Sequence, residues 1–545
     1  MFCTKLIWIF TAILATSQTV SAKKCVYVRI DNDFNSREID LVECKNVSSM
    51  NELSSDIRFD WRRLKVINKI GDTFTIAEND QGLEYIQRLD LSQAGSLDVA
   101  EYGFRGFSQL IELNISSTHT SILRNSWFSR RNNIQILDFS WNQLTSLKQD
   151  SLRTLSQLSV ANFSHNEIED IEMVAFSSLQ SMKILDLRNN RIAHLFDLGD
   201  LSTLEILNLD ENFLVELPPN GFHKLKGLRT LTLSENTIST LQRNCFYGLE
   251  ALRTLNISGN SITNIQNYIF DGFSTVLKEL DISKNYISQI DSNAFQNLNF
   301  LQILNLSGNS IKDLMENTFY GLNALRKLYL LNNDISSIEP RTFDELQNLE
   351  ELDLSGNALQ SFSGIVFGHS MSPRKLRKLF LKNNKLLEIH PHTFNHIPNI
   401  DYLSLSFNSI VRLDDNLLLP LTALKKLHID HNNIEELSAS LFNTTLLLQE
   451  LYIAHNKLTF FPEVDNEFRN LVKASLEGNP WQCPCLNDII DWMKQKGVDY
   501  KRTRDNPYYA GLKPICVLNS RNDCIKDIDV ARELRIVEIY TNSLK

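Results

Sequence analysis

Two groups of histidines are the residues whose type and spacing most directly suggest chemistry. Each group holds three residues, and they are His390, His392, His396 and His428, His431, His455. Neutral imidazole is a common metal ligand, and it gains a proton between about pH 5 and 8. Zinc is therefore an option for the HxHxxxH pattern of the first group, and a metal site or a low-pH switch is an option for the second. Ordinary solvent-exposed positions on an outer turn are the simpler interpretation of the first group, whereas the second group is expected on adjacent strands.

No catalytic pattern accompanies these histidines. The sequence contains no GxSxG, no HExxH, no phosphate-binding Walker loop and no dinucleotide-binding glycine pattern. Its recurrent polar residues are explained by the repeat described below. We therefore expect neither enzymatic activity nor a cofactor.

Cys245 is a thiol without an obvious partner. It comes directly before Phe246, at a position where other repeats carry Ala175, Ala294 or Thr318. These small residues indicate a confined, buried slot, and free cysteine is commonly buried. We expect a free buried thiol, and an intermolecular disulfide is the alternative.

A repeat positions all of these residues, and 301–319 shows it clearly. This stretch reads LQILNLSGNSIKDLMENTF, which fits LxxLxLxxNxL followed eight residues later by an aromatic residue. The spacing recurs from Ile86 to Leu471, with a usual step of about 24 residues. A period of this length indicates a solenoid whose units bury their apolar edges only against their neighbours.

Each unit is expected to contribute one strand to a parallel sheet. Leu304 and Leu306 are two residues apart and face the core, whereas Ile303 and Asn305 face outward. An asparagine after the strand can bond the unpaired backbone of the turn. The predicted ladder is Asn142, Asn166, Asn190, Asn212, Asn236, Asn260, Asn285, Asn309, Asn333, Asn357, Asn384, Asn408, Asn432 and Asn456. The predicted outer layer is Phe104, Phe128, Phe176, Phe222, Phe246, Phe270, Phe295, Phe319, Phe343, Phe367, Phe394 and Phe442.

The predicted fold class is an α/β solenoid, a horseshoe with a long parallel concave sheet and a disulfide-linked cap at each end. The wider phenylalanine layer would spread the backs of the units and curve the stack. The expected organisation is a signal peptide (1–22), an N-terminal cap and lead-in (23–81), a solenoid of about 16–17 repeats (82–478), a C-terminal cysteine cap (479–525) and a charged tail (526–545).

The N-terminal 22 residues predict export. Lys5 precedes an apolar run, and Val20-Ser21-Ala22 is a suitable cleavage site. No later stretch is apolar enough to cross a membrane, so we expect a secreted, extracellular protein. The net charge of −10, or −11 without Lys5, argues against nucleic acid as a partner.

The other cysteines fit an oxidising destination, because they lie where a solenoid must cover its apolar ends. We expect Cys25 to pair with Cys44 in the N-terminal cap. The C-terminal cap allows three pairings, and the preferred one joins Cys483 to Cys516 and Cys485 to Cys524. Trp481 is expected to close the core, and 487–496 has the apolar spacing of a short helix.

The repeats, the two-cysteine front cap and the rear cap that begins NPWQCPC resemble the extracellular leucine-rich repeat family. This family includes Toll-type receptor ectodomains, small matrix proteoglycans and neuronal guidance ectodomains. The text VDYKRTRDNPYYAGLKPICV is similar, more narrowly, to secreted insect leucine-rich proteins, some of which resemble the leucine-rich immune proteins of mosquitoes. No coiled coil follows the cap, which departs from the long immune forms. The resemblance implies recognition of an extracellular protein or glycan.

The outward strand positions predict where a partner would bind. Their N-terminal members are small and polar, whereas the C-terminal units carry aromatic residues beside cations, the composition of interface hot spots. The predicted partner-binding residues are Tyr329, Phe380, Tyr402, Phe407, His428, Tyr452, Lys327, Lys378 and Lys382. These flanking cations favour an acidic protein or a sulfated or phosphorylated glycan. Cys245 or the concave face could also mediate homo- or hetero-oligomers.

Six sequons predict N-glycosylation, which would obstruct part of the concave face. Four lie at outward strand positions, Asn114, Asn162, Asn256 and Asn305, and two lie elsewhere, Asn46 and Asn443. The predicted function is therefore recognition of a partner by a secreted protein in innate immunity or receptor-associated signalling. The alternative is a structural or adhesive protein of the extracellular matrix.

Overall fold

The computed structural model describes residues 24–28, 41–53, 61–78, 82–130, 132–267, 269–271, 276–368, 373–462, 468–500, 516–517 and 523–524. Over these residues the chain is a parallel-sheet solenoid of about 17 turns. It divides into two compact units. Unit 1 consists of Met1–Ile238, Asn244–Leu252 and Gly272–Ser274, and unit 2 consists of Ser239–Arg243, Arg253–Asp271 and Thr275–Lys545. The predicted signal peptide and the charged tail lie outside the described residues.

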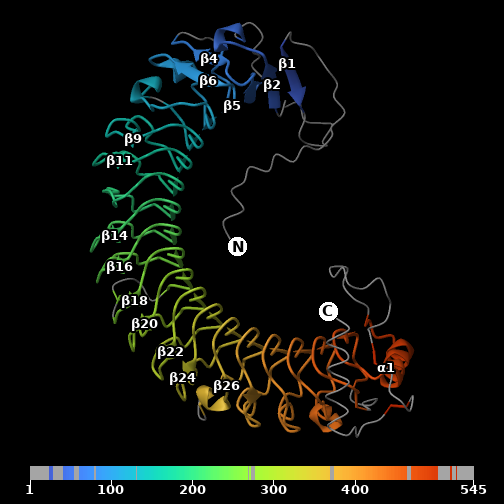
Figure 1. The fold of residues 1–545 in the computed structure, drawn as a ribbon. Coiled ribbons are helices and arrows are strands. Elements are labelled where there is room, and N and C mark those ends of the chain that lie inside the picture. The colour runs from blue at the N-terminus through green and yellow to red at the C-terminus, as the bar shows by residue number, and fades with distance from the viewer. Residues whose placement is uncertain are drawn as a thin grey trace. The chain divides into compact units, whose positions relative to one another are not determined.

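The main sheet of unit 1 begins with longer strands and continues with one three-residue strand per repeat, and Figure 1 shows the successive turns of this unit in blue and green. Its strands are β1 (Cys25–Val28), β2 (Leu41–Lys45), β3 (Arg63–Ile67), β5 (Arg88–Gln93), β7 (Glu112–Asn114), β8 (Ile136–Asp138), β10 (Val160–Asn162), β12 (Ile184–Asp186), β13 (Ile206–Asn208) and β15 (Thr230–Thr232). β1 runs antiparallel to β2, and the later neighbours in this unit are parallel.

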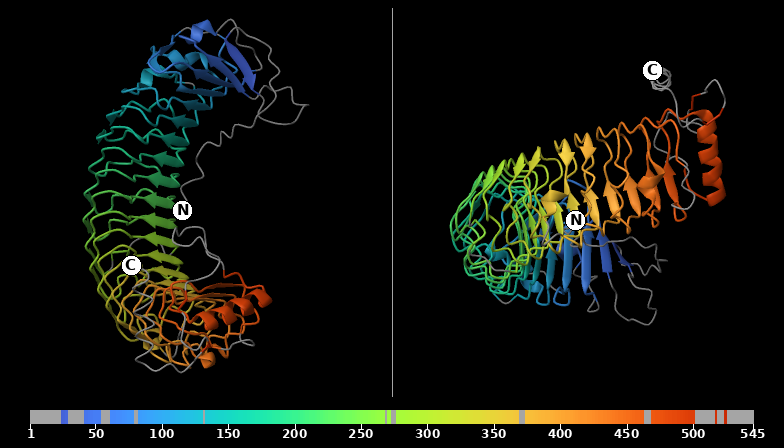
Figure 2. Two further views of the ribbon diagram at one scale, coloured as in Figure 1. Left: turned by 45° about the vertical axis from the view of Figure 1, so that its right-hand side comes forward. Right: turned by 90° about the horizontal axis from the view of Figure 1, so that it is seen from below.

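The main sheet of unit 2 has the same form, and Figure 2 shows its strands as parallel arrows. Its strands are β17 (Thr254–Asn256), β19 (Glu279–Asp281), β21 (Ile303–Asn305), β23 (Lys327–Tyr329), β25 (Glu351–Asp353), β27 (Lys378–Phe380), β29 (Tyr402–Ser404), β30 (Lys426–His428), β31 (Glu450–Tyr452) and β32 (Lys473–Ser475). Neighbouring strands pair without a shift in register, for example Leu379 with Leu403 and Leu427 with Leu451.

Short strands and single helical turns form the opposite layer. The short strands are β4 (Thr73–Ile76), β6 (Ser96–Val99), β9 (Ser146–Leu147), β11 (Asp170–Ile171), β14 (Glu216–Leu217), β16 (Thr240–Leu241), β18 (Asn264–Ile265), β20 (Gln289–Ile290), β22 (Asp313–Leu314), β24 (Ser337–Ile338), β26 (Ser361–Phe362) and β28 (Glu388–Ile389). The 3₁₀ turns are η1 (Met50–Glu52), η2 (Gly103–Gly106), η3 (Asn125–Trp127), η4 (Gly364–Phe367) and η5 (Ala439–Phe442), and the chain has one described α-helix, α1 (Cys483–Lys496).

The asparagine ladder forms as predicted. Asn309 donates from Nδ2 to the carbonyl oxygens of Leu306 (2.9 Å) and Ile282 (3.1 Å), and its Oδ1 accepts from the backbone N–H of Ile287 (3.0 Å). One buried amide thus satisfies backbone groups of two successive turns, which holds adjacent repeats in register. The phenylalanines of the opposite layer are buried, and neighbours such as Phe319 and Phe343 stack at 5.9 Å between ring centroids.

Both ends differ in detail from the sequence-based expectation. β2 and β3 belong to the main sheet of unit 1, although the repeat template is not visible in their sequence. The C-terminal helix begins at Cys483 instead of the expected 487, because a proline fits the first turn of a helix. The disulfides are Cys25–Cys44, Cys483–Cys516 and Cys485–Cys524, which are the pairs preferred above. Trp481 is fully buried and donates from Nε1 to the Leu476 carbonyl (2.6 Å).

Candidate recognition surface

The strands of unit 2 present two outward side chains each. In β27 the middle residue, Leu379, is fully buried, so Lys378 and Phe380 stand on the opposite face of the sheet. The constant register aligns such residues into columns across neighbouring strands. This outward side of the sheet, called the sheet face here, is where the predicted partner-binding residues lie.

Four aromatic side chains on adjacent strands form a continuous row on the sheet face. The centroid distances are 4.9 Å from Phe380 to Tyr402, 4.9 Å from Tyr402 to His428 and 4.2 Å from His428 to Tyr452. At one end, the Lys473 ammonium lies 5.5 Å from the Tyr452 ring centroid. These four residues, Phe380, Tyr402, His428 and Tyr452, are the sheet-face row, and mutual contact holds their rings in place.

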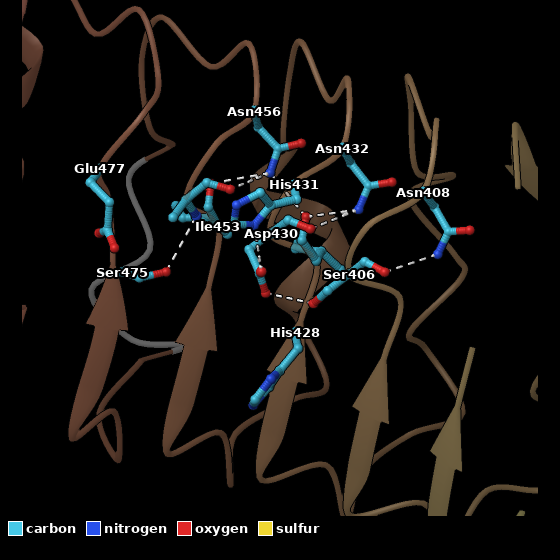
Figure 3. A network of polar contacts seen from close by, with 12 residues as sticks. Ser406, Asn408, His428, Asp430, His431, Asn432, Ile453, Asn456, Ser475 and Glu477 are labelled. Carbon is cyan, nitrogen blue, oxygen red and sulfur yellow. Dashed lines mark hydrogen bonds and ion pairs between the residues drawn. The ribbon is translucent and has the colours of Figure 1, made fainter. Parts of the chain in front are cut away.

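A second row lies on the turns that follow the strands. Phe407 stacks on His431 at 4.0 Å, and His431 stacks on His455 at 4.3 Å. The Lys382 ammonium lies 4.9 Å from the Phe407 ring centroid. Phe407, His431 and His455 are the turn-edge row. Figure 3 shows His431 beside the asparagine ladder and above His428.

The turn-edge row requires an unusual backbone. Phe407, His431 and His455 have φ of 58°, 54° and 52°, a left-handed conformation that disfavours bulky side chains. The same turn is left-handed in other repeats, some with asparagine or glycine, such as Asn332 and Gly356, and some with larger residues, such as Trp141. The left-handed turn is thus a property of the repeat, and the turn-edge row is distinguished by the rings that three successive repeats place on it.

The turn-edge row is the feature that the sequence analysis missed as a unit. Only Phe407 was assigned to partner binding, while His431 and His455 were considered as ligands or titrating groups. Aligning the residue before the ladder asparagine in three successive repeats would have shown an aromatic or histidine residue each time. The contact between the rings was not evident, because the left-handed turn sets their direction.

Several cations of this surface are already paired. Lys378 forms an ion pair with Glu351 (3.3 Å), and Lys426 forms one with Glu450 (2.8 Å). Two further ion pairs involve the residue just before a strand, and they join Arg326 to Glu350 (2.9 Å) and Arg377 to Asp401. These pairs leave fewer cations free to attract an acidic partner than the sequence suggested.

Tyr329 is separated from the sheet-face row by Asp353 on β25. Its hydroxyl donates to Glu351 Oε1 (3.3 Å), and burial together with that carboxylate raises the pKa of Tyr329 to about 12. Lys327 lies on the same strand, and no described residue forms an ion pair with it. The predicted surface therefore consists of the two rows and a more distant Tyr329–Lys327 pair.

Burial and hydrogen bonding set the protonation of the groups among the rows. Burial lowers the pKa of His428, and the neighbouring Lys426 and Lys382 act in the same direction. Burial would raise the pKa of Asp430, but hydrogen bonds from His431 (2.9 Å) and Ser406 (2.5 Å) outweigh it and lower the net pKa. Burial raises the pKa of Tyr402. At neutral pH the surface thus holds a neutral His428 next to an ionised Asp430.

The sheet face of unit 1 carries acids and amides in place of rings. One column is Asp138, Asn162, Asp186 and Asn208, called the acid–amide column. The other is the apolar stripe Ile136, Val160, Ile184 and Ile206. Burial raises the pKa of Asp138, and it raises the pKa of Asp186 to about 6.

The sequons fall in two environments. Asn162 and Asn305 are half-buried at strand ends, and the Oδ1 of each accepts the backbone N–H of the serine two residues later (3.0 and 3.1 Å). Asn114 and Asn256 make the same contact. Asn46 and Asn443 are exposed and lie outside the sheet strands. The region from Tyr329 to Tyr452 contains no sequon on its strands.

The other residues considered for chemistry, Cys245 and the outer histidines, do not form a metal or catalytic cluster among the described residues. Cys245 is a free, buried thiol, and burial raises its pKa to about 12. The rings of His390 and His392 are 6.0 Å apart on the layer opposite the sheet. Among the residues that the structure describes, no group of three or more His, Cys, Asp or Glu side chains could hold a metal ion. No described helix is long and apolar enough to cross a membrane.

Comparison with known families identifies the fold. The leucine rich repeat model matches residues 133–192, 202–262, 275–335, 325–371, 374–434 and 422–480, which is more than half of the chain. The protein therefore belongs to the leucine-rich repeat family.

Individual relatives are more distant. A trophoblast glycoprotein from Macaca fascicularis is 27% identical over 143 residues, which cover 26% of this chain and 29% of that protein. Among solved structures, the LRIM1/APL1C complex contains a chain with TM-score 0.56 and 22% identity, and the match covers 75% of this chain and 68% of that one. The Toll–Spatzle complex of Drosophila contains one with TM-score 0.51 and 17% identity, over 82% of this chain and 78% of that one. These likenesses show the fold.

Proposed function

We propose that this protein is a secreted recognition protein that binds an extracellular protein or glycan through the sheet face of unit 2. The two rows of ring contacts carry the proposal. They place seven aromatic or histidine side chains of four adjacent repeats in fixed positions before any partner arrives, and preorganised aromatic groups lose little entropy on binding.

An extracellular setting is supported by the leader-like N-terminal sequence and by three disulfides. Structural similarity to chains of the Toll–Spatzle and LRIM1/APL1C complexes supports a role in innate immunity or receptor-associated signalling. The sequons at Asn114, Asn162, Asn256 and Asn305 lie before Tyr329 in the chain. None of the six sequons lies on the strands from β23 to β31.

Affinity capture with matched variants tests the proposal. The full chain, the double variant Tyr402→Ala/Tyr452→Ala and the control Tyr286→Ala would be used as baits against extracellular fluid, followed by quantitative mass spectrometry. Tyr286 is 64% exposed and lies in unit 2 outside the sheet strands. We expect the double variant to retain less than about one tenth of the captured partner, because loss of one hot-spot ring commonly costs about 2 kcal/mol.

The control Tyr286→Ala should capture the partner as the unaltered chain does. Equal capture by all three baits would refute the use of this surface. Enrichment of collagen or basement-membrane proteins, lost in the double variant, would keep the surface but assign the protein to the extracellular matrix.

A further inference from the structure

The three histidines of the two rows lie within two adjacent repeats and in direct contact with other rings. His428 belongs to the sheet-face row, and His431 and His455 belong to the turn-edge row. Asp430 lies between the rows and links them, because it accepts from His431 Nδ1 and follows His428 by two residues (Figure 3). Changing the charge of one histidine therefore affects both rows.

His428 is held in a position that suits only the neutral ring. Tyr402 and Tyr452 contact it from both sides, and its Nδ1 lies 3.4 Å from the Tyr402 hydroxyl. Its Nε2 is fully buried without a hydrogen-bond partner. A protonated imidazole has two N–H donors, so protonation would leave one charged donor buried and unsatisfied.

Charged groups from each neighbouring element surround His428. Lys382 follows β27, Lys426 and Asp430 belong to the repeat of His428 itself, and Glu450 precedes Tyr452 on β31. Lys426 is already paired with Glu450, and Asp430 is already bonded to His431 and Ser406. The two carboxylates are thus occupied by other partners and cannot fully compensate a charge on His428.

The His431–His455 pair has a related constraint. A proton on His431 is compensated by Asp430, whose Oδ2 lies 2.9 Å from Nδ1. A second proton on His455 would place two cations in rings whose centroids are 4.3 Å apart. The resulting repulsion opposes the stack. On one side His455 packs against Gly478, where an added Cβ would lie only 2.2 Å from its Nδ1.

We propose that the two rows make this face a proton-sensitive surface, ordered at neutral pH and opened when His428 and the His431–His455 pair take up protons. If the rows hold a partner, that partner would be released in a mildly acidic compartment, and this consequence rests on the proposed function. The acid-dependent opening of the surface does not require a partner.

The sign follows from proton linkage. A histidine whose pKa is lower in the closed surface than its ordinary 6.5 binds fewer protons when closed than when open. The closed state is therefore favoured above about pH 6.5, and below that value the lowered pKa of His428 reduces the closed-to-open ratio by up to about tenfold per pH unit.

Hydrogen exchange of the full chain, without any partner, tests this opening. Protection of the peptides that cover β29–β31 would be compared at pH 7.5, 6.5 and 5.5, after correction for the intrinsic exchange rate, with β21 as the internal reference. We expect protection of β29–β31 to fall by up to about tenfold between pH 7.5 and 5.5, while protection of β21 stays constant. Unchanged protection of β29–β31 would overturn the proposal.

Variants identify the histidines. His428→Phe keeps a ring between Tyr402 and Tyr452, and His455→Asn places at the turn a residue that Asn332 already represents in another repeat. The double variant H428F/H455N should lose the acid response, and the control H390N/H392N, altered at two exposed histidines outside the rows, should keep it. Acid-dependent opening that persists in H428F/H455N would contradict the assignment.

A direct titration decides the outcome if the double variant does not fold. Histidine labelled at Cε1 in the unaltered chain, with His428 assigned through H428F, should titrate below pH 6.5. A His428 midpoint at or above 6.5 would exclude its role. Because neither measurement needs a partner, a negative result in partner capture and a negative result here are separate findings.

Discussion

The sheet faces of β8–β13 and β27–β31 have the same backbone and opposite surface chemistry. In both regions a buried apolar residue occupies the middle of each strand, leucine in all of them except β10, where it is Ala161, and an asparagine bonds the following turn. The outward positions hold the acid–amide column in unit 1 and the sheet-face row in unit 2. The fold is therefore determined by inward positions, and the outward positions are free to specify the partner.

The two faces also respond to acid in opposite directions. Asp186 of unit 1 has a raised pKa, so its region gains stability as the pH falls towards and below about 6. His428 of unit 2 has a lowered pKa, so its region loses stability over a similar range. A shared scaffold thus carries two surfaces that differ in how protons affect them.

The largest expected effect tests whether the scaffold is truly shared. Asn166→Ala and Asn432→Ala each remove a buried amide whose Nδ2 bonds carbonyls of two turns and whose Oδ1 accepts a backbone N–H, from Leu144 and Ile410 respectively. We expect each variant to lose about 3 kcal/mol of local stability, because several buried backbone groups become unsatisfied. Hydrogen exchange during urea unfolding measures the loss of local stability in each variant. If the two losses differ by more than about 1.5 kcal/mol, the two regions are not equivalent scaffolds.

A smaller effect sharpens the electrostatic contrast. Asp186→Asn keeps the Oδ1 that accepts the Arg188 N–H (2.9 Å) and removes the charge that burial disfavours. We expect unit 1 to gain about 1–3 kcal/mol above pH 6.5 and to lose the Asp186 contribution to its pH dependence between about pH 4 and 6. Thermal unfolding across this range checks the prediction. The exposed Asp150→Asn is the control and should change stability by less than about 0.5 kcal/mol.

The smallest expected change in stability comes from replacing a stacked ring on a left-handed turn. Comparing two such replacements separates a role in stability from a role in partner binding. Trp141 in unit 1 and Phe407 in unit 2 both adopt a left-handed turn and stack on a histidine, His165 at 3.9 Å and His431 at 4.0 Å. Replacement of either residue by glycine relieves backbone strain, which stabilises the fold by about 1 kcal/mol. It also removes the ring stack, which destabilises the fold by about the same amount. We expect net stability changes below about 1 kcal/mol in both variants. Partner capture should fall only for Phe407→Gly, and an equal fall for Trp141→Gly would remove the distinction between the faces.

The scaffold was predictable from sequence because each of its elements is local and repeated. The leucines, the ladder asparagines and the outer phenylalanines recur at one spacing, so a single unit predicts all the others. β2 and β3 were not predicted, because the asparagine after β3, Asn68, bonds the neighbouring turns but lies one residue short of the spacing in the repeat template. The start of α1 was placed four residues late, because the apolar spacing alone does not show that Cys483 and Cys485 belong to its first turn.

The candidate surface was predictable only in part. The strand period places Phe380, Tyr402, His428 and Tyr452 on one face. It does not show that Lys426 is bound to Glu450, because ion pairing depends on side-chain conformations across strands. Nor does it show the stack of His431 on His455, which depends on a backbone conformation that these residues rarely adopt.

The ion pairs of unit 2 have a consequence for how its repeats can be rearranged. The first outward residues alternate in sign along much of the sheet, as Lys327, Glu351 and Lys378, and later as Lys426, Glu450 and Lys473. Excising the single repeat that contains Glu450 would set Lys473 against Lys426, so like charges would meet in adjacent strands. We therefore expect loss of two adjacent repeats to be tolerated better than loss of one, because it keeps opposite charges in neighbouring strands. The sign of the first outward residue thus limits which repeats can be neighbours.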